Sequence, residues 1–285
     1  MIKESNLTEL VKKYDYFILD ADGVIWESNS PIGDSIKGLQ YLLSNKKSVF
    51  ILTNNSYKSR ADFVKKGKTV LGVELPADHW YTSSRITAVF IKEKFPEIKR
   101  VYVVGGPGIV EELSLVGINE VKGIEDSSKK YKEEEFWSTE IADVDCVITG
   151  LDPGFNYYKL IYATNCIRRG AKFIATNTDT GIKIGTYLMP GAGSLVAAIE
   201  KCSETKPILI GKPETISLEM IMKECKIPEA EKSKMLMIGD RLETDIQFAK
   251  NAGISSCIVL TGVTTKEMLH GDIKPDYLMD KLGTF

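Results

Sequence analysis

The stretch Tyr16-Phe17-Ile18-Leu19-Asp20-Ala21-Asp22-Gly23 places four apolar residues directly before two acids and a glycine. Three later apolar runs also end in short polar motifs: residues 49–52 before Thr53-Asn54-Asn55, 208–210 before Gly211-Lys212-Pro213, and 235–238 before Gly239-Asp240, with Asp245 five residues further on. Continuous apolar runs of this kind are typical of strands buried on both faces of a parallel sheet. Because ligands bind at the carboxyl ends of the strands in open α/β sheets, we expect the four motifs to meet in one crevice.

The residue types in these motifs suit the transfer of a phosphoryl group. Asp20 and Asp22 are two residues apart, so an extended backbone directs both side chains to the same side. Two carboxylates at such close range raise each other's proton affinity, and one can be charged while the other carries a proton. Carboxylate oxygens of Asp20, Asp240 and Asp245 are the ligands that Mg²⁺ prefers. Lys212, the Thr53 hydroxyl and nearby backbone N–H groups would orient phosphate oxygens.

Each motif taken alone has a simpler structural interpretation. An Asp-x-Asp-Gly sequence after a strand is a common turn, and Thr53-Asn54-Asn55 is typical of a helix N-cap. The lysine motif reads as a loop, and the last two acids suit the first turn of a helix. A calcium loop of the EF-hand type is poorly supported, because Gly23 falls too early and Val24 stands where the next acid is needed. The ordered recurrence after four apolar runs favours one shared site.

The four motifs together resemble the haloacid dehalogenase superfamily of aspartate-nucleophile hydrolases. The long gap between the second and third motifs is similar to that of members with a large cap domain inserted there. Three stretches resemble the group of 4-nitrophenylphosphatases, phosphoglycolate phosphatases and pyridoxal phosphatases within that superfamily: residues 54–60, 190–194 and 239–245. The resemblance extends from about residue 16 to about residue 276.

The resemblance implies a role for each motif residue. Asp20 would be the nucleophile that forms an aspartyl-phosphate, and Asp22 would protonate the leaving oxygen and later activate water. Phosphate-binding residues would be Thr53, Asn54, Asn55 and Lys212. Metal ligands for Mg²⁺ would be Asp20, Asp22 through its backbone carbonyl, Asp240 and Asp245.

The expected activity is Mg²⁺-dependent hydrolysis of small phosphomonoesters, such as 4-nitrophenyl phosphate in vitro and phosphoglycolate-type metabolites. A phosphatase for pyridoxal phosphate or sugar phosphates, or a phosphotransferase or mutase on the same core, is the alternative. A purely regulatory protein fits poorly with an intact pair of acids. The loops 150–156 and 177–181 are the candidates for reading the leaving group, and the resemblance suggests a homodimer formed through the cap.

The expected fold is an α/β protein with a Rossmann-like three-layer core, a parallel sheet, and an inserted α/β cap domain. We predict residues 1–98 as the first part of the core, 99–189 as the cap and 190–285 as the second part of the core. The strand at 208–210 and a helix at 194–202 are then assigned to the core.

Composition limits the partners. A net charge of −2 provides no general basic field for nucleic acid or an anionic membrane, and no apolar run has membrane-spanning length. The basic clusters at 65–68 and 129–130 are expected on solvated faces. Five scattered cysteines without metal-site spacing suit a reducing compartment, so we expect a cytoplasmic protein.

Overall fold

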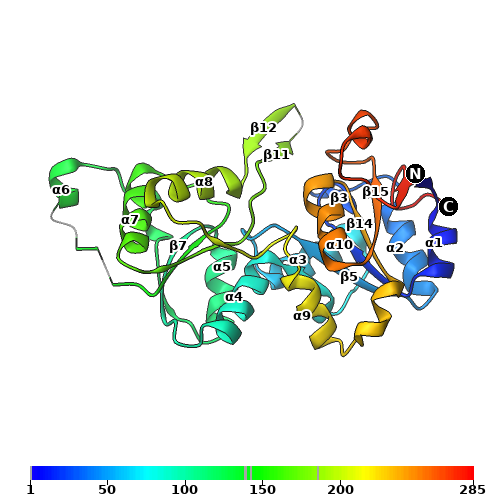
Figure 1. Ribbon diagram of the computed structural model, residues 1–285, viewed down its shortest axis with the longest axis horizontal. Coiled ribbons are helices and arrows are strands. Elements are labelled where there is room, and N and C mark those ends of the chain that lie inside the picture. The colour runs from blue at the N-terminus through cyan, green and yellow to red at the C-terminus, as the bar shows by residue number, and fades with distance from the viewer. Residues whose placement is uncertain (1, 138–139, 142, 185) are drawn as a thin grey trace. The chain divides into compact units, whose positions relative to one another are not determined.

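The computed structural model describes residues 2–137, 140–141, 143–184 and 186–285. The chain forms two compact units (Figure 1). The first unit comprises Met1–Thr53, Ala61–Tyr81 and Lys212–Phe285, and the second comprises Asn54–Arg60 and Thr82–Gly211. The first unit is therefore assembled from segments that lie far apart in the sequence, coloured blue, cyan and yellow to red in Figure 1.

The first unit is built on a seven-stranded sheet with the order β1-β16-β15-β14-β2-β5-β6. Neighbouring strands from β1 to β5 in this order run parallel. The bounds are β1 Lys3–Glu4, β2 Tyr16–Leu19, β5 Ser48–Thr53, β6 Trp80–Thr82, β14 Met235–Gly239, β15 Ser255–Val259 and β16 Tyr277–Met279. In the register, Leu19 of β2 pairs with Ile51 on one side and with Ile238 on the other. The carboxyl ends of β2, β5 and β14 are thus level, which places the residues after them at one edge of the sheet.

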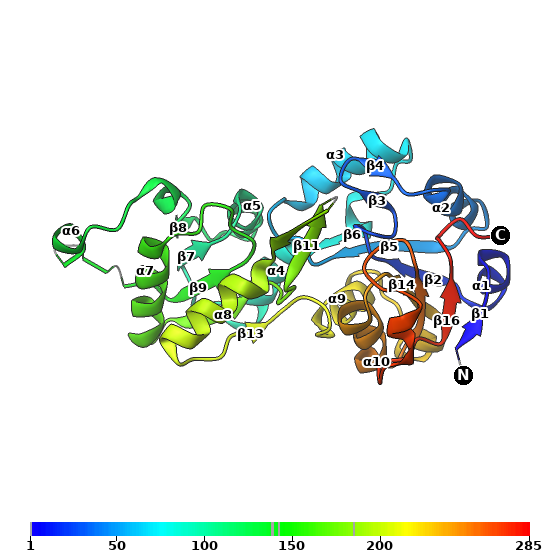
Figure 2. The same ribbon diagram turned by 90° about the horizontal axis from the view of Figure 1, so that it is seen from above.

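Helices cover both faces of this sheet (Figure 2). Helices α1 (Leu7–Lys13), α2 (Ser35–Ser44) and α3 (Arg60–Leu71) contribute to one apolar cluster with Phe17 and Leu19 of β2. Helices α9 (Ile216–Glu224) and α10 (Gln247–Ala252) lie on the opposite side. The predicted three-layer α/β core with a parallel sheet is confirmed. Shorter elements of this unit are the hairpin β3 (Trp26–Glu27) and β4 (Ser30–Pro31), the 3₁₀ turns η1 (Ala77–His79), η3 (Glu229–Lys234) and η5 (Glu267–His270), and the π-helical turn η4 (Leu242–Ile246).

The second unit has its own five-stranded parallel sheet, in the order β13-β10-β9-β7-β8. Its strands are β7 Arg100–Val104, β8 Glu120–Lys122, β9 Cys146–Thr149, β10 Lys172–Ala175 and β13 Ile208–Leu209. Its helices are α4 Ser83–Lys94, α5 Pro107–Leu115, η2 Glu125–Ser128, α6 Glu133–Trp137, α7 Tyr157–Arg168 and α8 Ala192–Ser203, and β11 (Gly181–Ile184) and β12 (Tyr187–Pro190) form a hairpin. The predicted separate α/β domain is therefore present.

Two elements that we assigned to the core belong to the second unit. The strand at 208–210 pairs through Ile208 and Leu209 with β10, so it extends the second sheet instead of the first. The helix expected at 194–202 is α8, whose Val196 and Ile199 join the apolar cluster of the second unit with Tyr162. Both assignments were wrong because an apolar pattern predicts a buried strand or helix without identifying its partner.

The limits of the second unit also differ from the predicted cap boundaries. The inserted domain was placed at 99–189, whereas the compact unit extends from Thr82 to Gly211 and includes 54–60. Helix α4 packs with α5 and helix α8 packs with α7, so both flanking helices belong to this unit.

Within the part of the chain that the structure describes, no helix has both the length and the apolarity needed to span a bilayer.

Candidate active site

Three buried carboxylates of the first unit come together at the edge predicted from the sequence. Asp20 follows β2, Asp240 follows β14, and Asp245 lies in the π-helical turn after it. Each residue offers a carboxylate oxygen within 4.8 Å of the other two. The segment after β14 curls around Asp245, whose Oδ2 accepts hydrogen bonds from the backbone N–H groups of Asp240 (3.1 Å) and Arg241 (3.0 Å). The backbone therefore fixes the third carboxylate of the cluster.

Glycines allow two loops to approach Asp240 closely. Gly23 has a φ of +89°, and a Cβ atom there would lie 2.7 Å from the Asp240 carboxyl group. A Cβ atom at Gly262 would lie 1.9 Å from Oδ2 of Asp240. This oxygen accepts a hydrogen bond from the backbone N–H of Val263 at 2.8 Å. Because Gly23 has no side chain, the loop that carries Asp20 and Asp22 can lie in contact with Asp240.

Lys212 lies inside the acid cluster, although it is far from every acid in the sequence. Its side chain is 2% exposed. Its Nζ donates to Oδ1 of Asp20 at 2.6 Å and to the carbonyl oxygen of Leu52 at 3.0 Å, and it lies 2.7 Å from Oδ1 of Asp245. The lysine motif therefore reaches the first acid, as the sequence predicted, even though the strand that precedes it belongs to the other sheet.

The electrostatics of this cluster show an excess of buried negative charge. Burial, opposed by Lys212 and reinforced by Asp245 and Asp240, holds the pKa of Asp20 well above its usual range. Burial, followed by the charge of Asp245, raises the pKa of Asp240 to about 7. The pKa of Lys212 is raised, because the attraction of Asp20 and Asp245 outweighs the effect of burial. One lysine thus faces three carboxylates, and its positive charge compensates only part of the repulsion among them.

These residues fit a divalent cation. The ligand atoms are hard carboxylate oxygens, which Mg²⁺ prefers, and the surplus negative charge would be neutralised by the ion. Oδ1 of Asp245 is buried and forms an ion pair of 2.7 Å with the ammonium group of Lys212, and a carboxylate oxygen can accept a second contact. A buried carboxylate oxygen in this state is suited to a metal or to one of its waters. Asp20, Asp240 and Asp245 are therefore the residues that would hold the ion.

Asp22 has surroundings different from those of the other acids. Its side chain is 49% exposed, and its Oδ1 accepts a hydrogen bond from the indole Nε1 of Trp26 at 3.0 Å. Nζ of Lys66 lies 3.8 Å from the same oxygen. The interpretation of 65–68 as a solvated basic cluster is wrong for Lys66, whose side chain is only 13% exposed. Trp26 and Lys66 were missed, although Trp26 follows Asp22 by four residues.

The second motif is divided between the two units. Thr53, at the end of β5, is buried in the first unit, whereas Asn54 and Asn55 belong to the second. Nδ2 of Asn54 donates to Oδ1 of Asp179 at 3.0 Å, and the backbone oxygen of Asn54 accepts from Nδ2 of Asn177 at 2.7 Å. Oδ1 of Asn55 accepts from a backbone N–H two residues on. Binding of phosphate by Asn54 and Asn55 stays a prediction.

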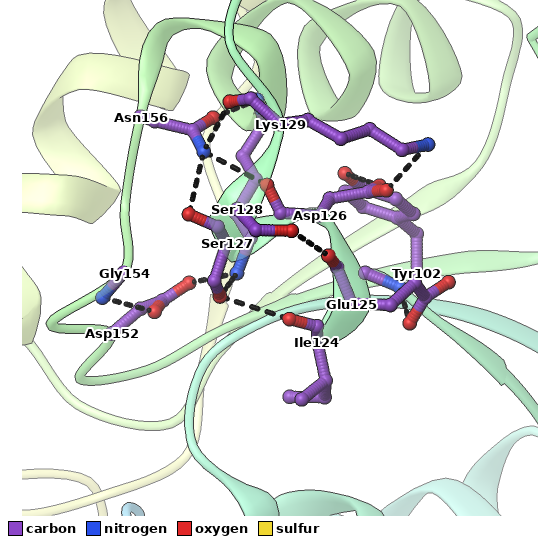
Figure 3. Close-up of polar contacts among 12 residues, drawn as sticks. Tyr102, Ile124, Glu125, Asp126, Ser127, Ser128, Lys129, Asp152, Gly154 and Asn156 are labelled. Atoms are coloured by element: carbon purple, nitrogen blue, oxygen red, sulfur yellow. Dashed lines mark hydrogen bonds and ion pairs between the residues drawn. The ribbon is translucent and has the colours of Figure 1, made fainter.

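The loop 150–156, a candidate for reading the leaving group, uses its polar side chains within the second unit (Figure 3). Asp152 forms an ion pair at 2.7 Å with Lys159, and the two side chains are 4% and 0% exposed. Nδ2 of Asn156 donates to the backbone oxygens of Asp126 (2.8 Å) and Lys129 (3.1 Å). These contacts give Asp152 and Asn156 a structural role.

Comparison with known proteins agrees with this geometry. The profile of the haloacid dehalogenase-like hydrolases matches residues 17–119, and a second profile, described as HAD-hydrolase-like, matches 209–285. The chain is 39% identical over 286 residues to phosphoglycolate phosphatase 2 of Arabidopsis thaliana, covering 97% of this chain and 94% of that protein.

Solved structures are similar over the same length. The crystal structure of 4-nitrophenylphosphatase from Thermotoga maritima has a TM-score of 0.82 at 33% identity and covers 96% of this chain and 97% of its own. Glycerol phosphate phosphatase from Mycobacterium tuberculosis, solved in complex with magnesium, has a TM-score of 0.79 at 25% identity and covers 96% of this chain and 77% of its own. From its sequence, its two sheets and its buried acids, the chain belongs to the haloacid dehalogenase-like hydrolase family.

Proposed function

We propose that this chain is a Mg²⁺-dependent phosphatase that hydrolyses small phosphomonoesters through an aspartyl-phosphate. The single observation that carries the proposal is the hydrogen bond of 2.6 Å between the buried ammonium group of Lys212 and the carboxylate of Asp20. A lysine held against the attacking carboxylate is positioned to bind the phosphoryl group that the carboxylate receives. Phosphoryl transfer depends mainly on such positioning and on neutralisation of charge.

The proposed reaction has two steps. In the first, an oxygen of Asp20 attacks phosphorus in line, the phosphorus–oxygen bond to the leaving group breaks, and Asp22 gives its proton to the leaving oxygen. In the second, Asp22 takes a proton from water as the water attacks the aspartyl-phosphate, which releases inorganic phosphate and restores Asp20. Lys212 and Thr53 hold phosphoryl oxygens in both steps. When bound, Mg²⁺ supplies positive charge that favours approach of the anionic substrate to the anionic nucleophile.

Phosphoglycolate-type metabolites are the substrate class that we propose, with 4-nitrophenyl phosphate as an artificial substrate. The support is the identity of 39% to a phosphoglycolate phosphatase over nearly the whole chain. Pyridoxal phosphate, sugar phosphates and transfer to a second alcohol are the alternatives. A panel of metabolites that reports kcat/KM, with and without an added alcohol acceptor, separates these possibilities.

Release of phosphate from 4-nitrophenyl phosphate tests the chemistry itself. We expect turnover that requires Mg²⁺ and is abolished by EDTA. Asp20→Asn should remove it, while Asp272→Asn, at an exposed position in the same unit, serves as the matched control. Wild-type protein that released no phosphate from any monoester in the presence of Mg²⁺ would refute the proposal. A cytoplasmic location and a homodimer formed through the second unit stay predictions. Analytical ultracentrifugation tests whether the homodimer forms.

A further inference from the structure

The loop after β2 folds back so that the side chain of Trp26 meets Asp22. The backbone N–H of Gly23 donates to the carbonyl oxygen of Trp26 at 2.9 Å. The backbone N–H of Trp26 donates to the carbonyl oxygen of Ala21 at 3.1 Å. The indole ring is fully buried. Its Nε1, the one polar atom of the ring, donates to Oδ1 of Asp22 at 3.0 Å. The loop backbone and the indole therefore constrain Asp22 together.

The indole is itself held firmly by other aromatic rings. It stacks on Phe63 of α3 with centroids 6.2 Å apart, and on Trp80 of β6 with centroids 6.0 Å apart and an interplanar angle of 12°. Trp80 directs its own Nε1 to the backbone oxygen of Leu75 at 3.4 Å. Trp80 thus shares the stack without contributing a hydrogen bond to Asp22.

Lys66 brings a positive charge to the same place. Its Nζ lies 4.0 Å from the centroid of the Trp26 ring and 3.8 Å from Oδ1 of Asp22. Helix α3 places Lys66 three residues after Phe63, on the same face of the helix, so that the amine lies near the aromatic stack. A lysine over an aromatic face is held by attraction to the ring quadrupole as well as by the nearby carboxylate.

We infer that Trp26 and Lys66 are positioning residues that fix the carboxyl group of Asp22 for proton transfer in the reaction. The inference rests on the proposed function of Asp22 as acid and base. Both contacts are made to Oδ1, and an oxygen that accepts an N–H hydrogen bond is the wrong place for the acid's own proton. In the proposed reaction, the proton is carried on Oδ2. The Oδ2–H bond breaks as the leaving oxygen takes the proton, and the bond re-forms with a proton from the attacking water.

A substitution of Trp26 tests the hydrogen bond. Trp26→Phe keeps an aromatic ring in the stack but removes the N–H group, and Trp80→Phe is the matched control because it removes an indole N–H from the same stack. A poor leaving group, such as that of an alkyl phosphate, needs the proton, whereas 4-nitrophenolate leaves with little help. Acid catalysis contributes about 100- to 10,000-fold, so we expect Trp26→Phe to lower kcat on the alkyl ester by roughly tenfold or more. Its effect on 4-nitrophenyl phosphate should be at most about threefold.

Substitutions of Lys66, on α3, test the contribution of its charge in the same way. Lys66→Met should lower kcat on the alkyl ester more than on the aryl ester, and Lys66→Arg should restore most of it because the charge remains. Lys65→Met, at an exposed neighbouring position, is the control and should behave as wild type. As a readout that does not depend on turnover, the indole N–H resonance of Trp26 should shift in Asp22→Asn, whereas that of Trp80 should not.

The outcomes separate this inference from the proposed function. Equal losses on alkyl and aryl esters, or equal losses in Trp26→Phe and Trp80→Phe, would overturn the positioning role while leaving the phosphatase reaction intact. An unchanged Trp26 resonance in Asp22→Asn would also overturn it. Wild-type protein that hydrolysed neither ester would overturn the proposed function, and the role of Trp26 and Lys66 with it.

Discussion

Substitution of Lys212 by methionine separates its contribution to the reaction from its contribution to stability. Methionine has a similar length but no charge, so Lys212→Met leaves Asp20 and Asp245 without their buried partner at 2.6 and 2.7 Å. Removing one member of a buried ion pair costs about 3–5 kcal/mol. For a chain of this size, that corresponds to a fall in Tm of roughly 5–8 °C in the metal-free protein. The loss should be smaller at pH 5.5 than at pH 8, because burial raises the pKa of Asp20 and favours its uncharged form at the lower pH.

The effect on turnover should be larger than stability alone explains. Loss of a preorganised charged donor to the transition state costs about 100- to 1,000-fold in kcat. The matched control is Lys159→Met in the second unit, where Nζ lies 2.7 Å from Asp152 and the lysine side chain is 0% exposed. It should lower Tm by a comparable amount and leave kcat/KM within about threefold of wild type. Both variants are assayed below their transitions, with unfolding followed by calorimetry and turnover by phosphate release.

Two results would refute this reasoning. If Lys212→Met and Lys159→Met lost the same small fraction of kcat/KM, the role of Lys212 would be structural only. If metal-free Lys212→Met were as stable as wild type at pH 8, the buried carboxylates would not depend on Lys212. A double variant with Asp20→Asn removes part of the unpaired charge, so it should recover some of the stability lost in Lys212→Met but none of the activity.

Three further predictions concern the acids. Asp20→Asn should stay folded, because it reduces repulsion in the cluster, and should lose essentially all hydrolysis; phosphate release within tenfold of wild type would exclude Asp20 as the nucleophile. Asp22→Asn should impair alkyl phosphates far more than 4-nitrophenyl phosphate, and equal losses on the two would exclude it as the leaving-group acid. Because the pKa of Asp240 is raised to about 7, the metal-free fold loses stability as pH rises from about 4 through 7. Since Mg²⁺ needs the ionised carboxylate, it should raise Tm more at pH 8 than at pH 6, and equal shifts would argue against Asp240 as a ligand.

The sequence predicted the position of a site residue wherever that position depends on residues close to it in the chain. Asp20 and Asp240 follow β2 and β14, Thr53 is the last residue of β5, and each comes after a run of apolar residues; the parallel register makes the ends of these strands level. Asp245 could be predicted because its Oδ2 bonds to the backbone only four and five residues before it. In these cases the strand and the residue that follows it determine the position together.

Predictions failed where the partner is distant in the sequence. The strand β13 has only two residues, and its apolar character gave no sign that it pairs with β10. Lys66 looked like one member of a solvated basic run, yet it is nearly buried while Lys65 and Lys68 are exposed. A signal for Lys66 existed, because it lies three residues after the buried Phe63 and so shares its helix face.

The long-range relation between the second and third motifs follows from where the chain passes from one unit to the other. Thr53 belongs to the first unit and Asn54 to the second, and Gly211 belongs to the second unit and Lys212 to the first. Within the second unit, a Cβ atom at Gly211 would lie 2.6 Å from Oδ1 of Asn54, so these two segments are in contact there. Within the first unit, Nζ of Lys212 donates to the carbonyl oxygen of Leu52, 160 positions earlier in the chain, at 3.0 Å. The two segments are therefore held side by side independently in each unit, and this pairing brings Lys212 to Asp20 even though its preceding strand belongs to the other sheet.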